Sequence, residues 1–140
     1  MKKLTYLLLV LIIVACSSND DNNQLFLEKY DNVVYVNPLL EKMAFDYSTK
    51  SIIVQGSDCI YSPLECNDCF DSSGNTIIDS IEEETENSLT IKKTRSSTDG
   101  SLYSYLVVYS VSESSNTLTQ TIDYYNYTQT WTRTFEEVCD

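Results

Sequence analysis

Four cysteines beyond residue 50 are the side chains in this sequence most suited to covalent or metal chemistry. Cys66 and Cys69 are separated by two residues, and Cys59 and Cys139 lie on either side of them. A C-x-x-C spacing occurs in redox sites, and four thiolates can bind zinc. No βαβ pattern surrounds the pair, and the charge of Asp68 would disfavour a reactive thiolate, so a redox role is disfavoured. An even number of cysteines also fits two disulfides, for which three pairings exist.

A fifth cysteine, Cys16, follows a segment that is typical of a secretory signal. Two lysines precede the apolar run Tyr6–Val14, which is too short to span a membrane, since a spanning helix needs about 20 residues. The run ends in Ile13-Val14-Ala15-Cys16, which resembles the bacterial lipobox. The resemblance implies removal of residues 1–15 as a lipoprotein signal peptide and acylation of Cys16, for example with palmitate. We therefore expect a lipid anchor in the bacterial outer membrane.

The residues after Cys16 indicate how the anchor and the folded part are connected. Residues 16–24 are polar and acidic, which predicts a lipidated flexible tether, and residues 25–140 are expected to form one domain. Acidic residues at this place are similar to the surface-export signal of Bacteroidota lipoproteins. That similarity implies a position on the cell surface, and the alternative is a plain spacer facing the periplasm.

Export has a consequence for the four other cysteines, because the periplasm is oxidising and favours disulfides over a zinc site. In the preferred pairing, Cys66–Cys69 is a local loop staple, and Cys59–Cys139 ties the third strand to the C-terminus. Pairing of Cys59 with Cys66 is among the alternatives.

The composition excludes several kinds of chemistry. The chain has no histidine, which excludes His-based catalysis and His-ligated metals. The formal charge is −12, and −14 after removal of the signal peptide, which argues against nucleic acid and anionic membrane surfaces as partners. Adjacent carboxylates such as Glu136 and Glu137 would point to opposite faces of a strand and cannot flank one bond. We expect no enzymatic activity, no metal site and no cofactor.

The elements that must position these residues are predicted to be strands. Leu25–Tyr30 has the length for one helical turn, and Gly56–Asn75, with three cysteines, is expected to be a long loop. Polar turn clusters recur every 8–12 residues and are too short for parallel crossovers, so neighbouring strands should pair antiparallel. The predicted strands are Asn32–Val36, Lys42–Tyr47, Ser51–Gln55, Thr76–Ile81, Ser88–Arg95, Leu102–Val111, Leu118–Tyr125 and Thr128–Glu136.

Eight strands in sequence order predict an all-β, antiparallel, eight-stranded up-and-down meander barrel, with an open meander or sandwich as the alternative. Closure would remove exposed strand edges, and an eight-stranded interior is filled by side chains or holds one small ligand. The chain is rich in tyrosine, and Tyr103, Tyr105, Tyr109 and Tyr127 are candidates to line a ligand cavity. The ordinary interpretation of these tyrosines is a hydrophobic core.

Several segments resemble a known family. Phe26–Tyr35 looks like the opening of small lipocalin-like lipoproteins of Bacteroidota, and Asn87–Ile91, Tyr109–Ser112 and Asn116–Thr119 are similar to their middle strands. The resemblance implies the lipocalin-like barrel already expected from the strand count.

The family resemblance also implies a cluster that closes the barrel. In the family a glycine and a tryptophan stand where this chain has Asn32 and Tyr35, and that tryptophan packs beneath an arginine of the last strand. Arg133 is the candidate arginine here, and Trp131 lies two residues before it on the same face. We expect Tyr35, Trp131 and Arg133 to form this cluster with a cation–π contact, unless Arg133 extends into solvent.

These expectations favour a monomeric envelope protein that binds a small apolar or amphipathic ligand. The alternative is an inhibitor or immunity-type lipoprotein that captures a cationic protein. The acidic run Asp79–Glu86 is a candidate contact surface for a cationic partner or a weak divalent-ion site, whereas its plain interpretation is a solvated hairpin end.

Overall fold

The computed structural model describes residues 24–139, so residues 1–15, Cys16 and most of the expected tether lie outside the described part. A short helix opens the described chain, at the place where the sequence predicts one helical turn, and strands make up most of the rest. The elements are α2 (Phe26–Lys29), β1 (Val34–Val36), β2 (Lys42–Asp46), β3 (Ser51–Gln55), β4 (Cys59–Pro63), β5 (Cys66–Phe70), β6 (Thr76–Glu84), β7 (Ser88–Ser96), β8 (Leu102–Ser112), β9 (Thr117–Ile122), the 3₁₀ helix η1 (Asp123–Tyr125) and β10 (Tyr127–Thr134).

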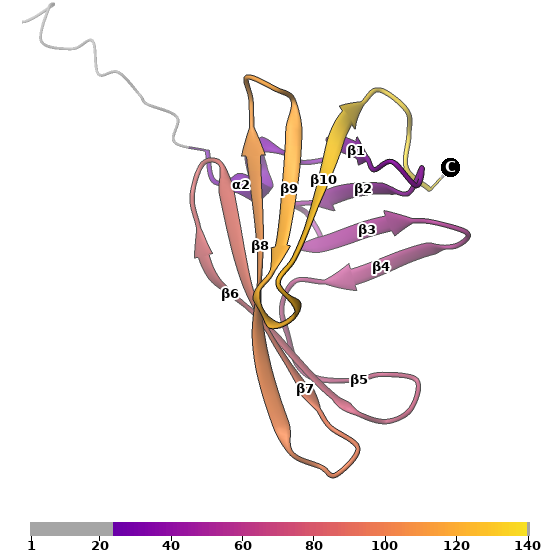
Figure 1. Cartoon of the computed structure of the whole chain (residues 1–140), viewed down its shortest axis with the longest axis vertical. Coiled ribbons are helices and arrows are strands. Elements are labelled where there is room, and N and C mark those ends of the chain that lie inside the picture. Colours follow the sequence, from indigo (N-terminus) through magenta and orange to yellow (C-terminus); the bar gives the residue numbers. More distant parts are fainter. Residues whose placement is uncertain (1–23, 140) are drawn as a thin grey trace, which may run out of the picture.

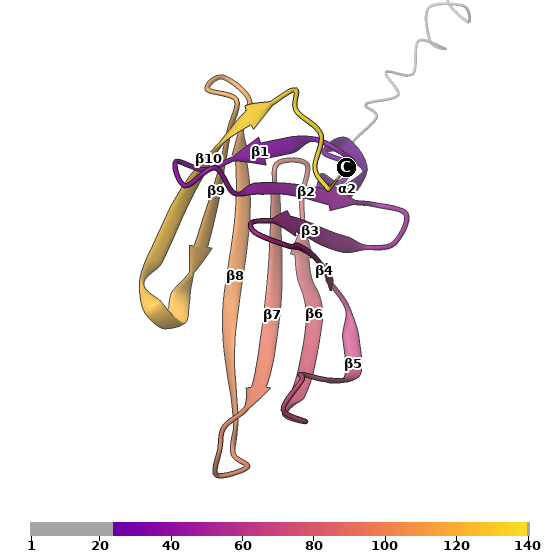
Figure 2. The same cartoon turned by 90° about the vertical axis from the view of Figure 1, so that its right-hand side faces the viewer.

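The ten strands of residues 24–139 form one antiparallel sheet in the order β4-β3-β2-β1-β10-β9-β8-β7-β6-β5. Most strands pair with their neighbours in sequence, and the pairing of β1 with β10 joins the first half of the meander to the second. The long strands β6–β9 run along the molecule, and β1–β4 run across them (Figures 1 and 2). The fold is therefore all-β and antiparallel, as the sequence predicts.

The strand count and the closure differ from the expected eight-stranded barrel. Gly56–Asn75, expected to be a loop, contains β4 and β5, and no ladder pairs these two strands with each other. They are the two edges of the sheet, although only Leu64 and Glu65 separate them. Both edges are irregular, because Pro63 has no N–H to donate and the register of β5 on β6 shifts between Cys66 and Cys69. The sheet therefore curves around its core without closing.

The core lies between the two crossing parts of the sheet. Strict alternation places Leu89 and Ile91 of β7 inside, each with no exposed surface, whereas Lys92 of the opposite face is exposed. Phe26 of α2 packs edge-on against Phe45 of β2, with ring centroids 5.0 Å apart. The helix thus covers one end of the core with aromatic surface.

Acidic residues of the β6–β7 hairpin and of the β8–β9 turn hold α2 in this position. The backbone N–H of Leu27 donates to Glu84 Oε1 at 2.8 Å, and Lys29 forms ion pairs with Glu86 and Glu113. The Tyr30 hydroxyl donates to Asn87 Oδ1 at 2.7 Å. Part of the acidic run therefore fixes a structural contact.

The C-terminal segment is attached to the outer side of β2–β4. Cys139 is disulfide-bonded to Cys59, and its N–H donates to Gln55 Oε1 at 2.9 Å. Lys42 Nζ donates to the carbonyl oxygen of Glu137 at 2.9 Å.

Within residues 24–139, none of the helices has the length and the apolar character that crossing a membrane requires.

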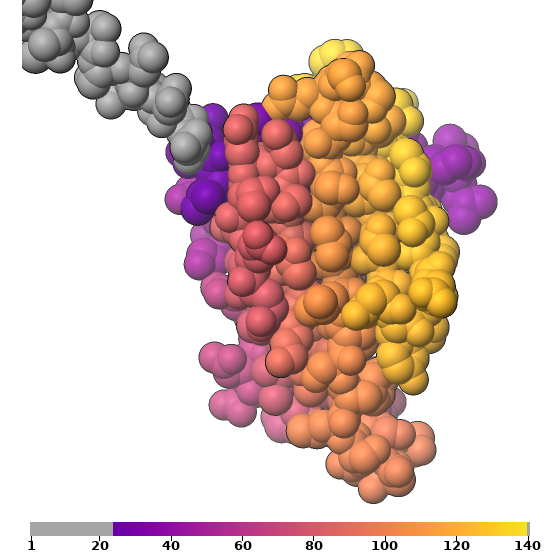
Figure 3. All heavy atoms as spheres, turned by 60° about the vertical axis from the view of Figure 1, so that its left-hand side comes forward, coloured from indigo at the N-terminus to yellow at the C-terminus, as the bar shows by residue number. Residues whose placement is uncertain are grey.

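Strand β8 is central, between β7 and β9, but one of its faces is bare. Leu102 is 59% exposed and Leu106 is 38% exposed, because nothing within residues 24–139 forms a second layer over the outer side of the long strands. The space-filling view shows this outer side of the sheet directly (Figure 3). Strand β8 is therefore central in the sheet, although its outer face carries exposed leucines.

Candidate functional site

The inner face of the long strands is buried at one end and accessible at the other. Strand β8 has eleven residues, about 37 Å, whereas β1–β4 have three to five. On the inner face of β8, Val107 and Tyr109 are buried, but Tyr103 and Tyr105 are only half-buried. The short crossing strands therefore leave part of the inner face open beyond the core.

Four tyrosines gather on this open part, and we call Tyr103, Tyr105, Tyr124 and Tyr125 the tyrosine cluster. The ring centroid of Tyr124 lies 5.5 Å from that of Tyr103, 6.1 Å from that of Tyr105 and 4.7 Å from that of Tyr125. Tyr124 is 57% exposed and Tyr125 is 64% exposed. The cluster is thus a continuous aromatic surface that solvent reaches.

The short helix η1 positions two of these rings. It interrupts the expected strand Leu118–Tyr125, and Asp123 Oδ1 accepts a hydrogen bond from the N–H of Leu106 at 2.8 Å. Asn126 follows with a left-handed φ of 47°, which turns the chain into β10. The turn places the Tyr124 ring against the Tyr103 and Tyr105 rings of β8.

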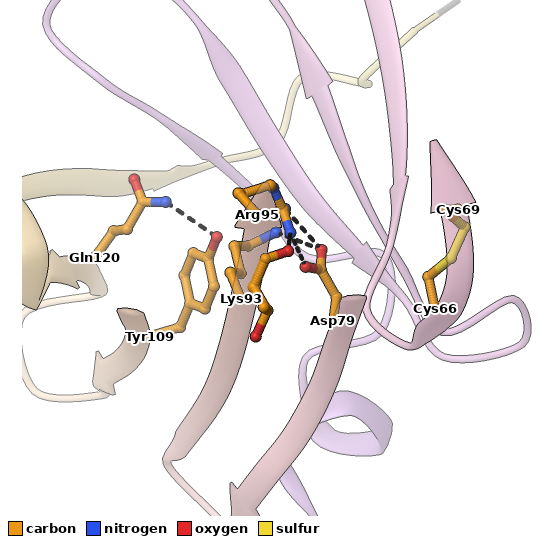
Figure 4. Close-up of polar contacts among 8 residues, drawn as sticks. Cys66, Cys69, Asp79, Lys93, Arg95, Tyr109 and Gln120 are labelled. Atoms are coloured by element: carbon orange, nitrogen blue, oxygen red, sulfur yellow. Dashed lines mark hydrogen bonds and ion pairs between the residues drawn. A yellow bond between two sulfur atoms is a disulfide. The ribbon is translucent and has the colours of Figure 1, made fainter. Parts of the chain in front are cut away.

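A buried carboxylate with two cations lies on the same inner face (Figure 4). Asp79 of β6 is 4% exposed and accepts from Lys93 Nζ at 3.0 Å and from Arg95 Nη2 at 3.1 Å. Burial lowers the pKa of Arg95, but its hydrogen bond and ion pair with Asp79 outweigh burial and leave the pKa raised. Two positive charges share one negative charge here, next to the half-buried Tyr103 and Tyr105 on the neighbouring strand.

The other two candidate ligand-lining tyrosines are placed differently. Tyr109 is 3% exposed, its hydroxyl accepts from Gln120 Nε2 at 3.0 Å, and burial raises its pKa. It packs edge-on against Phe45 and belongs to the core. Tyr127 is 44% exposed on β10 and donates to Gln129 Oε1 at 2.8 Å.

The structure brings together the three residues expected to close the barrel. Tyr35 of β1 stands opposite Arg133 of β10, where the two halves of the sheet meet. Tyr35 and Trp131 are buried, and Arg133 is exposed. Among the described residues a cation–π contact joins Lys29 to the Tyr30 ring at 5.5 Å, and none joins Arg133 to Tyr35 or Trp131. The expected cation–π contact is therefore absent among the described residues, although Arg133 and Tyr35 stand opposite each other on paired strands.

The cysteines lie in the two pairs that the sequence analysis preferred. The Cα atoms of Cys59 and Cys139 are 5.8 Å apart, and those of Cys66 and Cys69 are 5.9 Å apart, within the range of disulfides. In the described part of the chain, no group of three or more metal-ligating side chains gathers.

Sequence reasoning missed Asp79, Lys93 and Arg95 as neighbours of the tyrosines. The signal was present in β7, where Lys93 and Arg95 alternate in step with Ile91 and so share its inward face. The tyrosines of η1 gave no such signal, because their place depends on the turn at Asn126.

Comparison with known proteins finds no family model, no curated protein and no solved structure that matches this chain.

Proposed function

We propose that this chain is a non-enzymatic binding module, anchored by lipid at Cys16 in the bacterial outer membrane, for a small amphipathic ligand. The observation that carries the proposal is the tyrosine cluster, in which the rings of Tyr124 and Tyr125 are more than half exposed. Aromatic rings offer apolar area and their hydroxyls offer hydrogen bonds, so a ligand with an apolar and a polar part suits them.

The lipocalin-like relationship is part of the same proposal. A single antiparallel meander curved around an apolar core supports it. The ten strands and the gap between β4 and β5 distinguish this sheet from a closed eight-stranded barrel. In the proposal the ligand therefore lies on the open inner face and not in a sealed interior.

The position of α2 supports the proposed anchor. The described chain begins next to α2, at one end of the long strands, and the β7–β8 turn lies at the other end (Figure 1). Tyr103 lies at the start of β8, near that turn. An anchor at Cys16 would hold the α2 end near the membrane and leave the tyrosine cluster facing away from it.

A titration of the full chain with octyl glucoside below its micellar threshold tests the binding proposal, with glucose as the polar control. We expect saturable binding of octyl glucoside that Tyr124→Ala weakens about tenfold, because the lost ring contact is worth about 1–2 kcal/mol. Tyr61→Ala is the matched control, since Tyr61 is an exposed tyrosine of β4 outside the cluster. No saturable binding, or equal weakening by Tyr61→Ala, would reject the proposed ligand surface.

Capture of a cationic protein is the second candidate, and the exposed Glu82 and Glu83 of the β6–β7 hairpin favour it. Glu84 and Glu86 of the same run contribute less, because they bind α2. Titration with a cationic lysozyme at low and high salt separates the candidates. Salt-sensitive binding that the variant Glu82→Gln/Glu83→Gln weakens would favour capture of a protein.

A further inference from the structure

A pocket of about 300 Å³ lies at the α2 end of the molecule, away from the tyrosine cluster. Its walls combine apolar side chains, Val33 and Val111, with the aromatic side chains of Tyr30 and Tyr35. Arg133 also lines it and is shared with an adjoining hollow of about 550 Å³. The pocket therefore offers apolar walls and a guanidinium in one place.

The side chains of Tyr35 and Arg133 line this pocket and form no hydrogen bond or ion pair with other residues of 24–139. Tyr35 is only 1% exposed, yet its hydroxyl makes no hydrogen bond to the described residues. The Arg133 guanidinium forms no ion pair with them either. The Tyr35 hydroxyl is not fully enclosed, so it faces open space in the pocket wall, where a ligand atom can accept a hydrogen bond from it.

The other charged groups of the pocket are already paired. Lys29 forms ion pairs with Glu86 and Glu113, and the Tyr30 hydroxyl donates to Asn87. Lys29 and its two glutamates together leave one negative charge, and Arg133 is the cation of the pocket wall that forms no ion pair with the described residues. Burial raises the pKa of Tyr35 to about 12, with a further rise from Tyr30 and an opposing effect of the Arg133 charge. The hydroxyl therefore stays protonated at neutral pH and is available as a donor.

We propose that this pocket binds a small carboxylic acid with an apolar body, at a second site independent of the tyrosine cluster. Arg133 presents a planar fork of donors that matches a carboxylate, and Tyr35 adds a hydroxyl donor from the strand opposite. The apolar body lies against Val33 and Val111. A neutral ligand of the same shape gains the apolar contact and loses the contact with Arg133.

The test is a titration of the ¹⁵N-labelled full chain with phenylacetate, followed by nuclear magnetic resonance, with phenylacetamide as the neutral probe. We expect saturable shifts for phenylacetate at the amides of Val33 and Val111 and at least tenfold weaker binding of phenylacetamide. Arg133→Gln should raise Kd for phenylacetate at least tenfold. Tyr35→Phe should raise it several-fold. Lys92→Gln, which removes an equal charge from the exposed face of β7, should change it less than twofold.

Circular dichroism and urea unfolding of each variant establish that it is folded before its affinity is compared. The proposal is overturned if phenylacetate gives no saturable shifts, or if phenylacetamide binds equally well. It is also overturned if folded Arg133→Gln binds phenylacetate as tightly as the unchanged chain. Shifts confined to the tyrosine cluster would assign the ligand to that surface and reject the pocket at Arg133.

Discussion

Asp79 determines whether the cations of the open inner face are neutralised. Its carboxylate is buried, and both of its partners come from β7, with Lys93 directly opposite and Arg95 two residues further on. The side chains of Lys93 and Arg95 are only 17% and 21% exposed. Water could therefore compensate these cations only in small part if the contact with Asp79 were lost. Removal of one charge therefore leaves two cations poorly solvated and close together.

Asp79→Asn should accordingly lower the free energy of unfolding by about 2–3 kcal/mol, less than for a fully buried pair because both cations keep some solvent contact. Urea unfolding at neutral pH measures the change. Glu83→Gln is the matched control, since Glu83 is an exposed carboxylate of the same strand, and its effect should stay within about 0.5 kcal/mol. Equal effects of the two variants would show that the buried cluster adds no stability.

Tyr35 gives the stability of the protein a dependence on alkaline pH. Its pKa rises from 10.0 in the unfolded chain to about 12 in the folded protein, chiefly because of burial. The unfolded state therefore loses this proton first, and stability is retained below pH 10 and decreases as the pH approaches 12. From pH 9 to pH 11.5 the decrease due to Tyr35 should be about 2 kcal/mol.

Comparison of the unchanged chain with Tyr35→Phe isolates this effect, because the remaining tyrosines titrate in both proteins. The free energy of unfolding of Tyr35→Phe, measured in urea at both pH values, should fall by about 2 kcal/mol less. Parallel pH dependence in the two proteins would contradict the proposed burial of a neutral Tyr35 hydroxyl.

For individual residues, local sequence patterns predict which side chains point inwards, but not which distant residues those side chains contact. Alternation in β7 places Leu89 and Ile91 correctly in the core. Asp79 belongs to an acidic run that looks solvated, yet it is buried, because the cations that neutralise it lie 14 and 16 residues further along the chain. Sequence spacing alone does not specify that register.

Among the elements, the two edge strands β4 and β5 are the least regular, and each carries a disulfide. Cys59–Cys139 spans 80 residues and attaches the C-terminal segment to β4. Cys66–Cys69 spans three residues within β5. In the chain-entropy model a long loop restricts the unfolded chain more than a short one, so the two disulfides should differ in their contribution to stability.

Paired serine substitutions test this difference. Cys59→Ser/Cys139→Ser should lower the free energy of unfolding by about 4 kcal/mol, and Cys66→Ser/Cys69→Ser by less than about 2 kcal/mol. Urea unfolding measures both changes, and peptide mapping under non-reducing conditions identifies the bonds. Recovery of a peptide in which Cys59 is joined to Cys66 would contradict the pairing.

Elements were predictable where alternation and turn residues coincide. The expected strand Ser51–Gln55 matches β3, and Ser88–Arg95 is one residue shorter than β7. The strands β4 and β5 were missed, because Cys59–Pro63 and Cys66–Phe70 show no clear alternation and carry a proline and a disulfide. Strand β6 extends further than expected, since register with β7 continues past an irregularity near Glu83.

For the whole molecule, the proposed anchor and the tyrosine cluster lie at opposite ends of the long strands. Eight peptide units join Cys16 to Gln24, and a chain of that length spans at most about 28 Å. Strand β8 is about 37 Å long and runs from the β7–β8 turn to the β8–β9 turn at the α2 end. A lipid at Cys16 would therefore keep the β8–β9 turn closer to the membrane, on average, than the β7–β8 turn.

Spin labels at two turns measure this orientation on the full lipidated chain bound to vesicles that contain a nickel-chelating lipid. Ser114→Cys places a label in the β8–β9 turn and Thr98→Cys places one in the β7–β8 turn, and both positions are exposed. Relaxation by the nickel should be stronger at position 114, because the tether limits the distance of the α2 end from the bilayer. Cys16→Ser should release the protein from the vesicles and remove the effect at both labels. Equal relaxation at the two positions would contradict the proposed orientation, and vesicle binding by Cys16→Ser would contradict the anchor itself.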